Sequence, residues 1–274
     1  MAEQLWGATP LIDVMNHVPT WIVGLALTAA AEIFAIGLML LTRTISGVER
    51  LKLNNEVAGF KFAVVGLFYG VLLAFVVIAV WDEYRNTETA VRNEAKAAVD
   101  LHRITVALPF EAGAKVRQLL ITYTDHVRKY EWPTMARGKP SEDASKDLDQ
   151  LSTAIFELEP QGYRQLMVYQ AALRLLAVIA DNRNERLDGA DGSMSGLLWF
   201  VLIVGAGVTL GYPAFFGASN LLAQTLMTAA LAALVALSLL LAIAFDYPFT
   251  GSVKISPLPF DQALQQMPPN ASPP

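Results

Sequence analysis

Long apolar stretches alternate with charged ones along this chain, and their lengths predict helices that cross a membrane. Between Gly192 and Phe245 there are 54 consecutive residues without Asp, Glu, Lys or Arg. One bilayer crossing takes about 20 apolar residues, so this stretch holds two crossings and a turn. The turn falls at the small polar break Gly217–Asn220. The two predicted spans are Leu197–Phe216 and Ala223–Phe245.

Two further apolar stretches precede the charged middle of the chain. Thr20–Thr42 is apolar except for Glu32, and Phe62–Trp81 contains no charged residue. The loop 43–61 joins these two predicted spans. The tail 1–19 contains no Lys or Arg, so the first span is not predicted to be a cleavable signal peptide. A proline-rich tail, 246–274, follows the last span, and we expect 268–274 to be disordered.

The segment 82–195 between the two pairs of spans is predicted to be a soluble helical domain. It carries 15 of the 20 basic residues and 18 of the 25 acidic residues. Thr87–Ile104 lacks Gly and Pro and is rich in good helix formers. Because nothing interrupts the chain between Phe62 and Ala107, we expect the second span to continue into this domain as one long helix that ends before Pro109.

The rest of the middle segment also has helical periodicity. Apolar residues recur at helical spacing in Ala112–Tyr130 and in Gln161–Leu187, and Ser141 is a plausible N-cap for a helix between them. No alternation of Val, Ile and Thr suggests strands. The predicted fold class is therefore all-α: an integral membrane protein with two transmembrane helix pairs flanking a helical soluble domain.

Composition excludes several classes of function. Hydrophobic residues make up 54% of the chain and charged residues 16%, against about 25% charged residues in ordinary soluble domains. The net charge of −5 does not fit a nucleic-acid binder. The absence of cysteine excludes thiolate chemistry, and three scattered histidines make a histidine-rich metal site improbable. No P-loop, GxSxG or HExxH motif is present. We therefore expect no enzymatic activity, no catalytic residue, no metal and no cofactor.

The side of the membrane on which the soluble domain lies stays open. Basic residues of the loop 43–61 favour that loop as the cytoplasmic element. The basic residues that flank the soluble domain and Lys254 in the tail favour the opposite orientation.

Glu32 is the first candidate functional residue, because an ionised carboxylate in the middle of a span costs at least about 2.5–3.5 kcal/mol. No basic residue of the spans can pair with it, so its expected partners are water or the hydroxyls of Tyr69, Thr209 or Ser238. Two interpretations are open: a protonated structural glutamate, and a member of an ion or proton path.

Other candidates lie on the second and third spans. Small residues let helices approach closely in lipid, either within one subunit or between subunits. These candidate packing residues are Ala63, Gly66, Gly70 and Ala74 in the second span and Gly207 and Gly211 in the third. Another face of the second span carries Phe68, Leu72 and Phe75, which would gate a pore by dewetting if several copies surrounded an axis. Lipid-facing or core packing is the alternative for these three.

Several short motifs occur in order around the two pairs of spans. They are Asn55-Glu56-Val57-Ala58-Gly59-Phe60, Leu73-Ala74-Phe75 through Val80-Trp81, Glu131-Trp132-Pro133, and Asp246-Tyr247-Pro248-Phe249-Thr250-Gly251. As an ordered set, over about Asn54–Phe260, they resemble the bacterial four-span membrane proteins with a bestrophin-like domain. The residues that carry the resemblance are Asn55, Glu56, Gly59, Trp81, Trp132, Pro133, Asp246, Pro248, Phe249 and Gly251.

The resemblance implies an oligomeric ion channel, because bestrophins proper are pentameric anion channels with an apolar neck on the second span. By that analogy Phe68, Leu72 and Phe75 would form the neck. The calcium-binding acidic clusters of eukaryotic bestrophins have no clear match here. Implied partners are the lipid bilayer of a bacterial inner membrane and further copies of this chain. Two alternatives are a stator-like, ion-coupled scaffold subunit and a non-conducting receptor whose helical domain binds a protein partner.

Overall fold

The computed structural model describes residues 14–137 and 139–268, and within them the chain forms helices and no strand. The contacts divide it into two compact units. The membrane unit consists of Met1–Asp82 and Ser193–Asp246, and the polar unit of Glu83–Gly192 and Tyr247–Pro274. Parts of the predicted tails, residues 1–13 and 269–274, lie outside the described residues.

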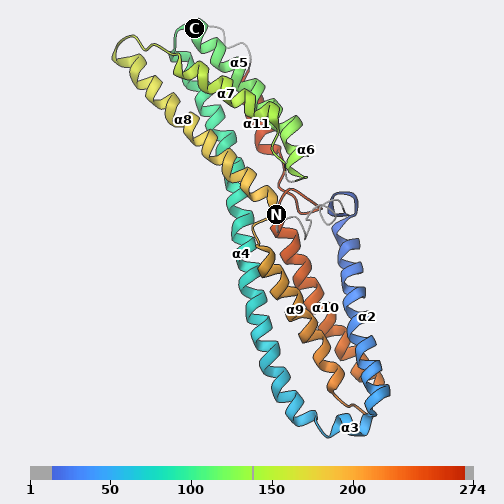
Figure 1. The fold of residues 1–274 in the computed structure, drawn as a ribbon. Coiled ribbons are helices and arrows are strands. Elements are labelled where there is room, and N and C mark those ends of the chain that lie inside the picture. The colour runs from blue at the N-terminus through green and yellow to red at the C-terminus, as the bar shows by residue number, and fades with distance from the viewer. Residues whose placement is uncertain (1–13, 138, 269–274) are drawn as a thin grey trace. The chain divides into compact units, whose positions relative to one another are not determined.

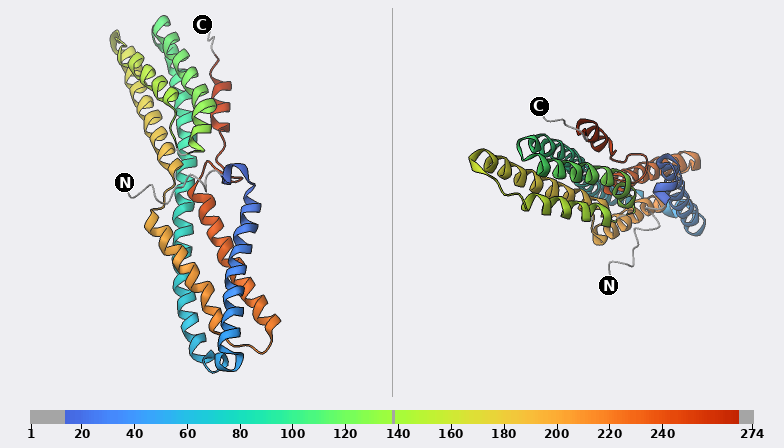
Figure 2. Two further views of the ribbon diagram at one scale, coloured as in Figure 1. Left: turned by 45° about the vertical axis from the view of Figure 1, so that its right-hand side comes forward. Right: turned by 90° about the horizontal axis from the view of Figure 1, so that it is seen from above.

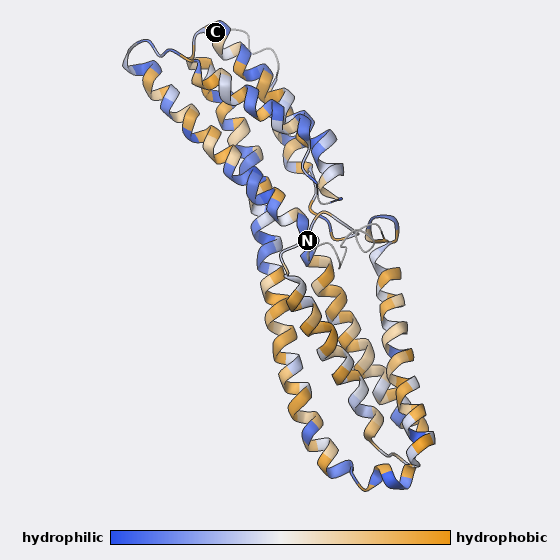
Figure 3. Cartoon of the chain, viewed as in Figure 1, coloured by the Kyte–Doolittle hydropathy of each residue, from blue (hydrophilic) through white to orange (hydrophobic). Residues whose placement is uncertain are grey.

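The membrane unit contains the four apolar stretches, each in a helix (Figures 1 and 3). Its elements are α2 (Thr20–Ser46), α3 (Val48–Lys52), the first part of α4 (Asn55–Ile104), α9 (Gly196–Gly211), the 3₁₀ turn η4 (Tyr212–Phe215) and α10 (Leu221–Asp246). Within the described residues, four helices are long and apolar enough to cross a membrane. The predicted four-span, all-α architecture is therefore confirmed.

Small residues allow the helices of the membrane unit to pack closely. Its buried core contains Ala35 of α2, Tyr69 of α4, Ala206 of α9 and Ala232 of α10. Gly205 of α9 receives the Tyr69 ring, since a Cβ at this glycine would lie 2.7 Å from the ring. Close approach of this kind replaces the hydrophobic driving force that lipid removes.

The third span ends as an α-helix earlier than its predicted boundary at Phe216. The α-helical hydrogen bonding of α9 stops at Gly211, and the chain continues through η4 as a tighter 3₁₀ turn. Pro213 explains the change, because proline has no N–H to donate and its ring collides with the carbonyl group four residues earlier.

The helix α4 is continuous over 50 residues, from Asn55 to Ile104. The predicted continuation of the second span into the charged segment is therefore confirmed. A short 3₁₀ turn, η1 (Thr105–Ala107), follows it, and Pro109 precedes the next helix.

The polar unit packs shorter helices against the second part of α4. They are α5 (Phe110–His126), the π-helical turn η2 (Val127–Glu131), α6 (Trp132–Met135), α7 (Glu142–Phe156), α8 (Gly162–Asp188), the 3₁₀ turn η3 (Gly189–Asp191) and α11 (Leu258–Gln266). The Ser141 side chain caps α7 by accepting from the N–H of Ala144. Figure 2 shows α11 and α8 on opposite sides of the α4 segment of this unit.

The helix α11 forms within the segment that the sequence analysis assigned to a partly disordered tail. Phe260 of this helix is fully buried, and Ile255 before it is also part of the core. The two residues pack with Tyr123, Leu151 and Ile179 into one apolar cluster. This part of the C-terminal segment is therefore an integral helix of the polar unit.

Candidate functional site

The exposed face of α4 is the first element of the candidate site. Phe68 and Phe75 are 73% and 69% exposed, and Val71 and Ile78 are exposed between and beyond them. Leu72 is only partly buried and packs against the core of the membrane unit. The structure thus places two of the three predicted neck residues on an open face and turns the third toward the core.

The row of small residues lies at the other edge of the same exposed face. At about 100° per residue, Ala63, Gly66, Gly70 and Ala74 form a row well over 90° around the helix from the two phenylalanines. A Cβ added at Gly66 or Gly70 would meet nothing within 4 Å. The described residues of this chain therefore leave the small row open to close approach from outside.

The two glycines of the third span behave differently from each other. Gly211 packs against Leu38 of α2, at 3.3 Å from its would-be Cβ, whereas Gly207 has nothing within 4 Å. Gly205, which accommodates Tyr69, is the tightest glycine of this helix. The residues around Gly205 in the sequence do not predict this close packing, because Tyr69 comes from a distant segment of the chain.

Glu32 lies on the same side of α2 as the buried residues Ala35 and Met39, and it is half-buried. Among the described residues its carboxyl group has no hydrogen bond or ion pair. The Ser238 hydroxyl donates instead to the carbonyl of Leu234 at 2.8 Å. The hydroxyls of Tyr69 and Thr209 are buried without a partner. The expected pairing of Glu32 with one of these hydroxyls is therefore not formed.

Asn55, the first residue of α4, fastens the loop between α9 and α10. Its amide donates to the carbonyl of Gly217 at 2.8 Å, and its side-chain oxygen accepts from the Gly217 N–H at 2.9 Å. Arg43 donates to the carbonyl of Ala218, and Gln224 donates to that of Phe216. Three side chains thus satisfy the backbone of a segment that has no helix hydrogen bonds of its own.

Gly217 itself leaves no room for a side chain. A Cβ there would lie 2.5 Å from the amide nitrogen of Lys52 and 2.7 Å from the carbonyl oxygen of Val48. Both atoms belong to backbone, which cannot rotate away as a side chain does. We expect Gly217→Ala to destabilise the protein by about 1–3 kcal/mol, measured as a lower thermal unfolding midpoint in detergent. The matched control is Gly207→Ala, which enters open space in a helix and should be neutral or slightly stabilising. Equal midpoints for the two variants would contradict the expectation.

Asp246, at the end of α10, holds the start of α9. Its Oδ1 accepts from the backbone N–H groups of Ser193 and Met194 at 2.9 and 3.0 Å and from the Ser193 hydroxyl. Its Oδ2 accepts from the Trp199 indole N–H at 3.2 Å. Nearby, the Trp81 ring meets the edge of Phe245 at 4.7 Å between centroids. The Asp246 carboxylate thus joins the end of α10 to the start of α9.

The rest of this motif makes a turn that belongs to the polar unit. The Ile255 N–H donates to the Pro248 carbonyl at 2.8 Å, and Gly251 adopts a φ of 69°, which favours glycine. The Phe249 ring meets the edge of Trp132 at 5.4 Å. Most of the family-motif residues described above thus make structural contacts within their own unit. Glu56 is an exception, since it is exposed.

A buried ion cluster lies at the centre of the polar unit, consisting of Glu94, Glu131, Arg183 and Arg186. Arg186 is fully buried and binds Glu94 through Nε at 2.7 Å and Glu131 through Nη2 at 2.8 Å. Arg183 binds the other oxygen of Glu131 at 2.6 Å. Two carboxylates and two guanidinium groups make the cluster neutral, so the burial of each charge is compensated.

Further contacts surround this cluster on several elements. The Tyr123 hydroxyl of α5 donates to Glu94 at 2.6 Å, and the Ser141 N–H donates to Glu131 at 3.3 Å. The Trp132 and Phe260 rings lie 5.6 and 5.7 Å from the guanidinium carbon of Arg186. The cluster therefore ties α4, α5, η2, α8 and α11 into one unit, and Trp132 of the family motif is part of its wall.

Burial and the neighbouring charges shift the pKa of Glu131 in the cluster and of Tyr123 beside it. Burial alone would raise the pKa of the Glu131 carboxyl, but the charges and hydrogen bonds of Arg186 and Arg183 outweigh burial and lower it. Burial, together with the neighbouring Glu94 carboxylate, raises the pKa of the Tyr123 hydroxyl well above its ordinary value. Glu131 is therefore charged and Tyr123 neutral at physiological pH.

These shifts predict an acid-labile polar unit. Because the folded pKa of Glu131 is depressed, its contribution to stability is complete above the unfolded carboxyl pKa of about 4.3. It is lost as the pH falls from there through the lower folded pKa. Hydrogen exchange of α8, measured at about pH 6 and at successively lower pH, should show this loss. In Glu131→Gln the slope of stability against pH should be smaller by up to about 1.4 kcal/mol per pH unit. Equal slopes of stability against pH in the wild-type protein and in Glu131→Gln would contradict a lowered pKa of Glu131 in the folded state.

No group of three or more His, Asp or Glu side chains that could hold a metal ion occurs within residues 14–137 and 139–268. His126 contacts the Asp147 carboxylate, and its ring packs edge-on against the Tyr130 ring. These contacts are typical of a structural histidine.

The fold defines an all-α integral membrane protein in which two hairpins of apolar helices flank a helical polar unit. The family model for the bestrophin-like domain matches residues 29–260. The chain therefore belongs to the family of proteins with a bestrophin-like domain, as its motifs indicated.

Solved structures of bacterial bestrophin homologues share this fold. One substituted form of the homologue from Klebsiella pneumoniae matches with a TM-score of 0.69 and 13% identity, over 89% of this chain and 96% of that chain. A structure of the same homologue phased on zinc gives a TM-score of 0.66 and 13% identity, over 87% and 96%. A structure described only as a membrane protein gives 0.67 and 14%, over 87% and 96%. The comparison with curated proteins finds no match.

Proposed function

We propose that the protein is an oligomeric ion channel in a bacterial inner membrane that conducts ions passively through a pore lined in part by α4. Further copies of the chain, five by analogy with bestrophins, would surround this pore. The observation that carries the proposal is the uncovered face of α4, where Phe68 and Phe75 stand exposed one above the other. Copies arranged around an axis would turn these rings into a narrow apolar constriction, which gates by dewetting.

The small row on the same helix supports such an arrangement. Ala63, Gly66, Gly70 and Ala74 leave space that nothing in the described chain fills. A neighbouring helix that packs against this row would come close to α4 and direct the phenylalanine edge toward the axis. The bestrophin-like fold of the chain is consistent with this architecture.

The test is the conductance of the purified protein in a planar bilayer under a salt gradient. We expect the wild-type protein to conduct without a partner. The double variant Phe68→Ala, Phe75→Ala should raise the conductance several-fold, because it widens and wets the constriction. Phe200→Ala is the matched control, since Phe200 is also an exposed phenylalanine of the membrane unit but lies on α9. An intact oligomer without current, or equal effects of both changes, would refute the proposed pore.

Glu32 favours a second candidate, an ion-coupled scaffold subunit similar to the stators of flagellar motors. A half-buried acid with no partner among the described residues fits a site through which a proton or cation passes. The same bilayer recording separates the candidates. A channel with Glu32 in its pathway should change its reversal potential in Glu32→Gln, whereas a stator-like subunit should be silent in both forms. A reversal potential near that of chloride and unaffected by Glu32→Gln would leave Glu32 with a structural role.

A further inference from the structure

Four exposed residues of α4 recur at intervals of seven and form a line along the membrane unit: Lys61, Phe68, Phe75 and Asp82. Each member lies only about 20° around the helix from the one before it and about 10.5 Å further along. Phe68 and Phe75 are the exposed rings proposed above to form the pore constriction. The line therefore continues past that constriction to a basic residue at one end and an acidic residue at the other.

The two charged ends of this line are separated by the thickness of a bilayer. Lys61 and Asp82 are 21 positions apart in the sequence, which is about 32 Å of helix at 1.5 Å per residue. The hydrocarbon core of a bilayer is about 30 Å thick. No Asp, Glu, Lys or Arg occurs between the two residues. Each charge therefore lies where the line leaves the apolar layer and meets water.

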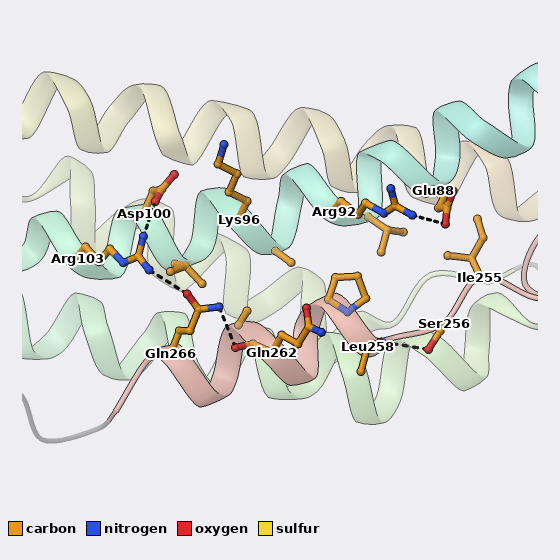
Figure 4. Close-up of a pocket in the computed structure, with 15 residues that line it drawn as sticks. Glu88, Arg92, Lys96, Asp100, Arg103, Ile255, Ser256, Leu258, Gln262 and Gln266 are labelled. Atoms are coloured by element: carbon orange, nitrogen blue, oxygen red, sulfur yellow. Dashed lines mark hydrogen bonds and ion pairs between the residues drawn. The ribbon is translucent and has the colours of Figure 1, made fainter.

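Both charges are free of partners within the part of the chain that the structure describes. Lys61 and Asp82 are exposed, and neither side chain makes an ion pair or hydrogen bond to a described residue. The exposed Arg92, further along α4 in the polar unit, differs in this respect, because it pairs with Glu88 at 2.6 Å (Figure 4). The charges of Lys61 and Asp82 are thus available to ions in solution.

The acidic end of the line favours a water-filled mouth over a lipid surface. The headgroup layer of a membrane carries negative charge, which attracts a lysine and repels a carboxylate. Asp82 is an exposed carboxylate without an ion pair, so contact with headgroups would be unfavourable for it. Lys61 lies on the same line of the same helix, and one environment for the whole line therefore fits a pore better than lipid.

We propose that Lys61 and Asp82 select ions by charge at the two mouths of the pore. The inference rests on the channel proposed above and names the residues that determine its ion preference. In the assembled oligomer the lysines form a ring that attracts anions at one mouth, and the aspartates form a ring that attracts cations at the other. Because the rings are about 32 Å apart and the Debye length is about 8 Å at physiological salt, each ring acts on its own mouth.

The reversal potential under a gradient of potassium chloride tests the two rings separately. We expect Lys61→Gln to shift it toward the potassium potential and Asp82→Asn to shift it toward the chloride potential. Each change should alter the ratio of cation to anion permeability several-fold. Both shifts should shrink at about 1 M salt, where the Debye length falls to about 3 Å. A purely structural effect of either substitution would not follow the salt concentration in this way.

Matched controls remove a charge of the same sign near the same end of the span but away from the line. Arg50→Gln changes an exposed residue of α3, which precedes the start of α4 (Figure 1). Glu83→Gln changes the residue after Asp82, about 100° around the helix. Neither control should shift the reversal potential. A shift as large in a control as in its matched variant would overturn the proposal.

Charged thiol reagents add a readout that starts from an assembled protein, since the chain has no cysteine of its own. The variant Lys61→Cys is inserted into the bilayer and then treated with a methanethiosulfonate that carries either an ammonium or a sulfonate group. The ammonium should move the reversal potential toward that of chloride, and the sulfonate toward that of potassium. Equal shifts from the two reagents would show an effect of size rather than charge and would overturn the ring of lysines.

The outcomes separate this inference from the channel itself. A protein that conducts, with a reversal potential that neither Lys61→Gln nor Asp82→Asn shifts, overturns the charged rings and leaves the channel in place. A well-assembled oligomer without current refutes the channel and the rings with it. Opposite shifts in the two variants, together with silent controls, support both.

Discussion

Replacing Arg186 with alanine is expected to destabilise the polar unit by about 3–5 kcal/mol, since the change leaves Glu94 and Glu131 buried with too little positive charge. Both carboxylates are fully buried, and Arg186 binds both of them. Loss of its contacts with the Trp132 and Phe260 rings adds to the cost. Thermal unfolding followed by protease resistance of the polar unit should show a midpoint lower by roughly 6–20 °C.

Two further variants isolate the cause. Arg92→Ala removes an arginine from an exposed ion pair on the same α4 segment of this unit and should cost about 0.5 kcal/mol or less. Adding Glu94→Gln to a variant with Arg186→Met should recover part of the lost stability, because it removes one stranded charge. An Arg186→Ala protein that unfolds at the wild-type temperature would show that the cluster does not hold the unit together.

Replacing Asp246 with alanine is expected to cost roughly 3–5 kcal/mol in the membrane unit, because four donors lose one shared acceptor. Two of them are the backbone N–H groups of Ser193 and Met194, which precede α9, and one is the Trp199 indole. Unpaired donors at the edge of a bilayer have few alternatives. Asp246→Asn, which keeps one oxygen and the shape, should lose much less. The thermal midpoint of the purified protein in lipid nanodiscs measures both, and equal losses would contradict an acceptor role.

The spans were predictable because a bilayer imposes a simple requirement on sequence. Charge-free runs such as Gly192–Phe245 have few soluble explanations. The continuity of α4 followed from the absence of Gly and Pro between Gly70 and Pro109. Local chemistry also sufficed for the Ser141 cap.

The buried ion cluster was not predicted, since each of its ion pairs joins residues that are 52 to 92 positions apart in the chain. A signal was nevertheless present. Glu94 lies in the apolar row of its helix with Ala90 and Leu101, and Arg183 and Arg186 continue the row of Leu176 and Ile179. A charged residue in a buried register requires an opposite charge, but periodicity alone does not identify which one.

The neck prediction was limited in the same way. Phe68, Leu72 and Phe75 share one broad side of a helix, yet Leu72 packs against the core while the phenylalanines remain exposed. The helical spacing gives the angle between side chains, but the position of the neighbouring helices decides where the buried arc ends. The choice between lipid and a pore for an exposed arc depends on further copies of the chain.

The wide turn η2 makes the polar unit sensitive to the number of residues in α5 and α6 rather than only to their identity. A π-helical turn accommodates one residue more than an α-helical turn, and here it ends at Glu131, immediately before Trp132. Deleting a single residue from Val127–Tyr130 would let the segment relax to a regular α-helix. The side chains on either side of the turn would then keep nearly the same relative direction, whereas one further inserted residue would rotate every preceding side chain by about 100° relative to Glu131 and Trp132. Tyr123 and Glu131 reach the same cluster from either side of this turn. An insertion here would therefore act as a register shift that no compensating point substitution at the cluster could correct.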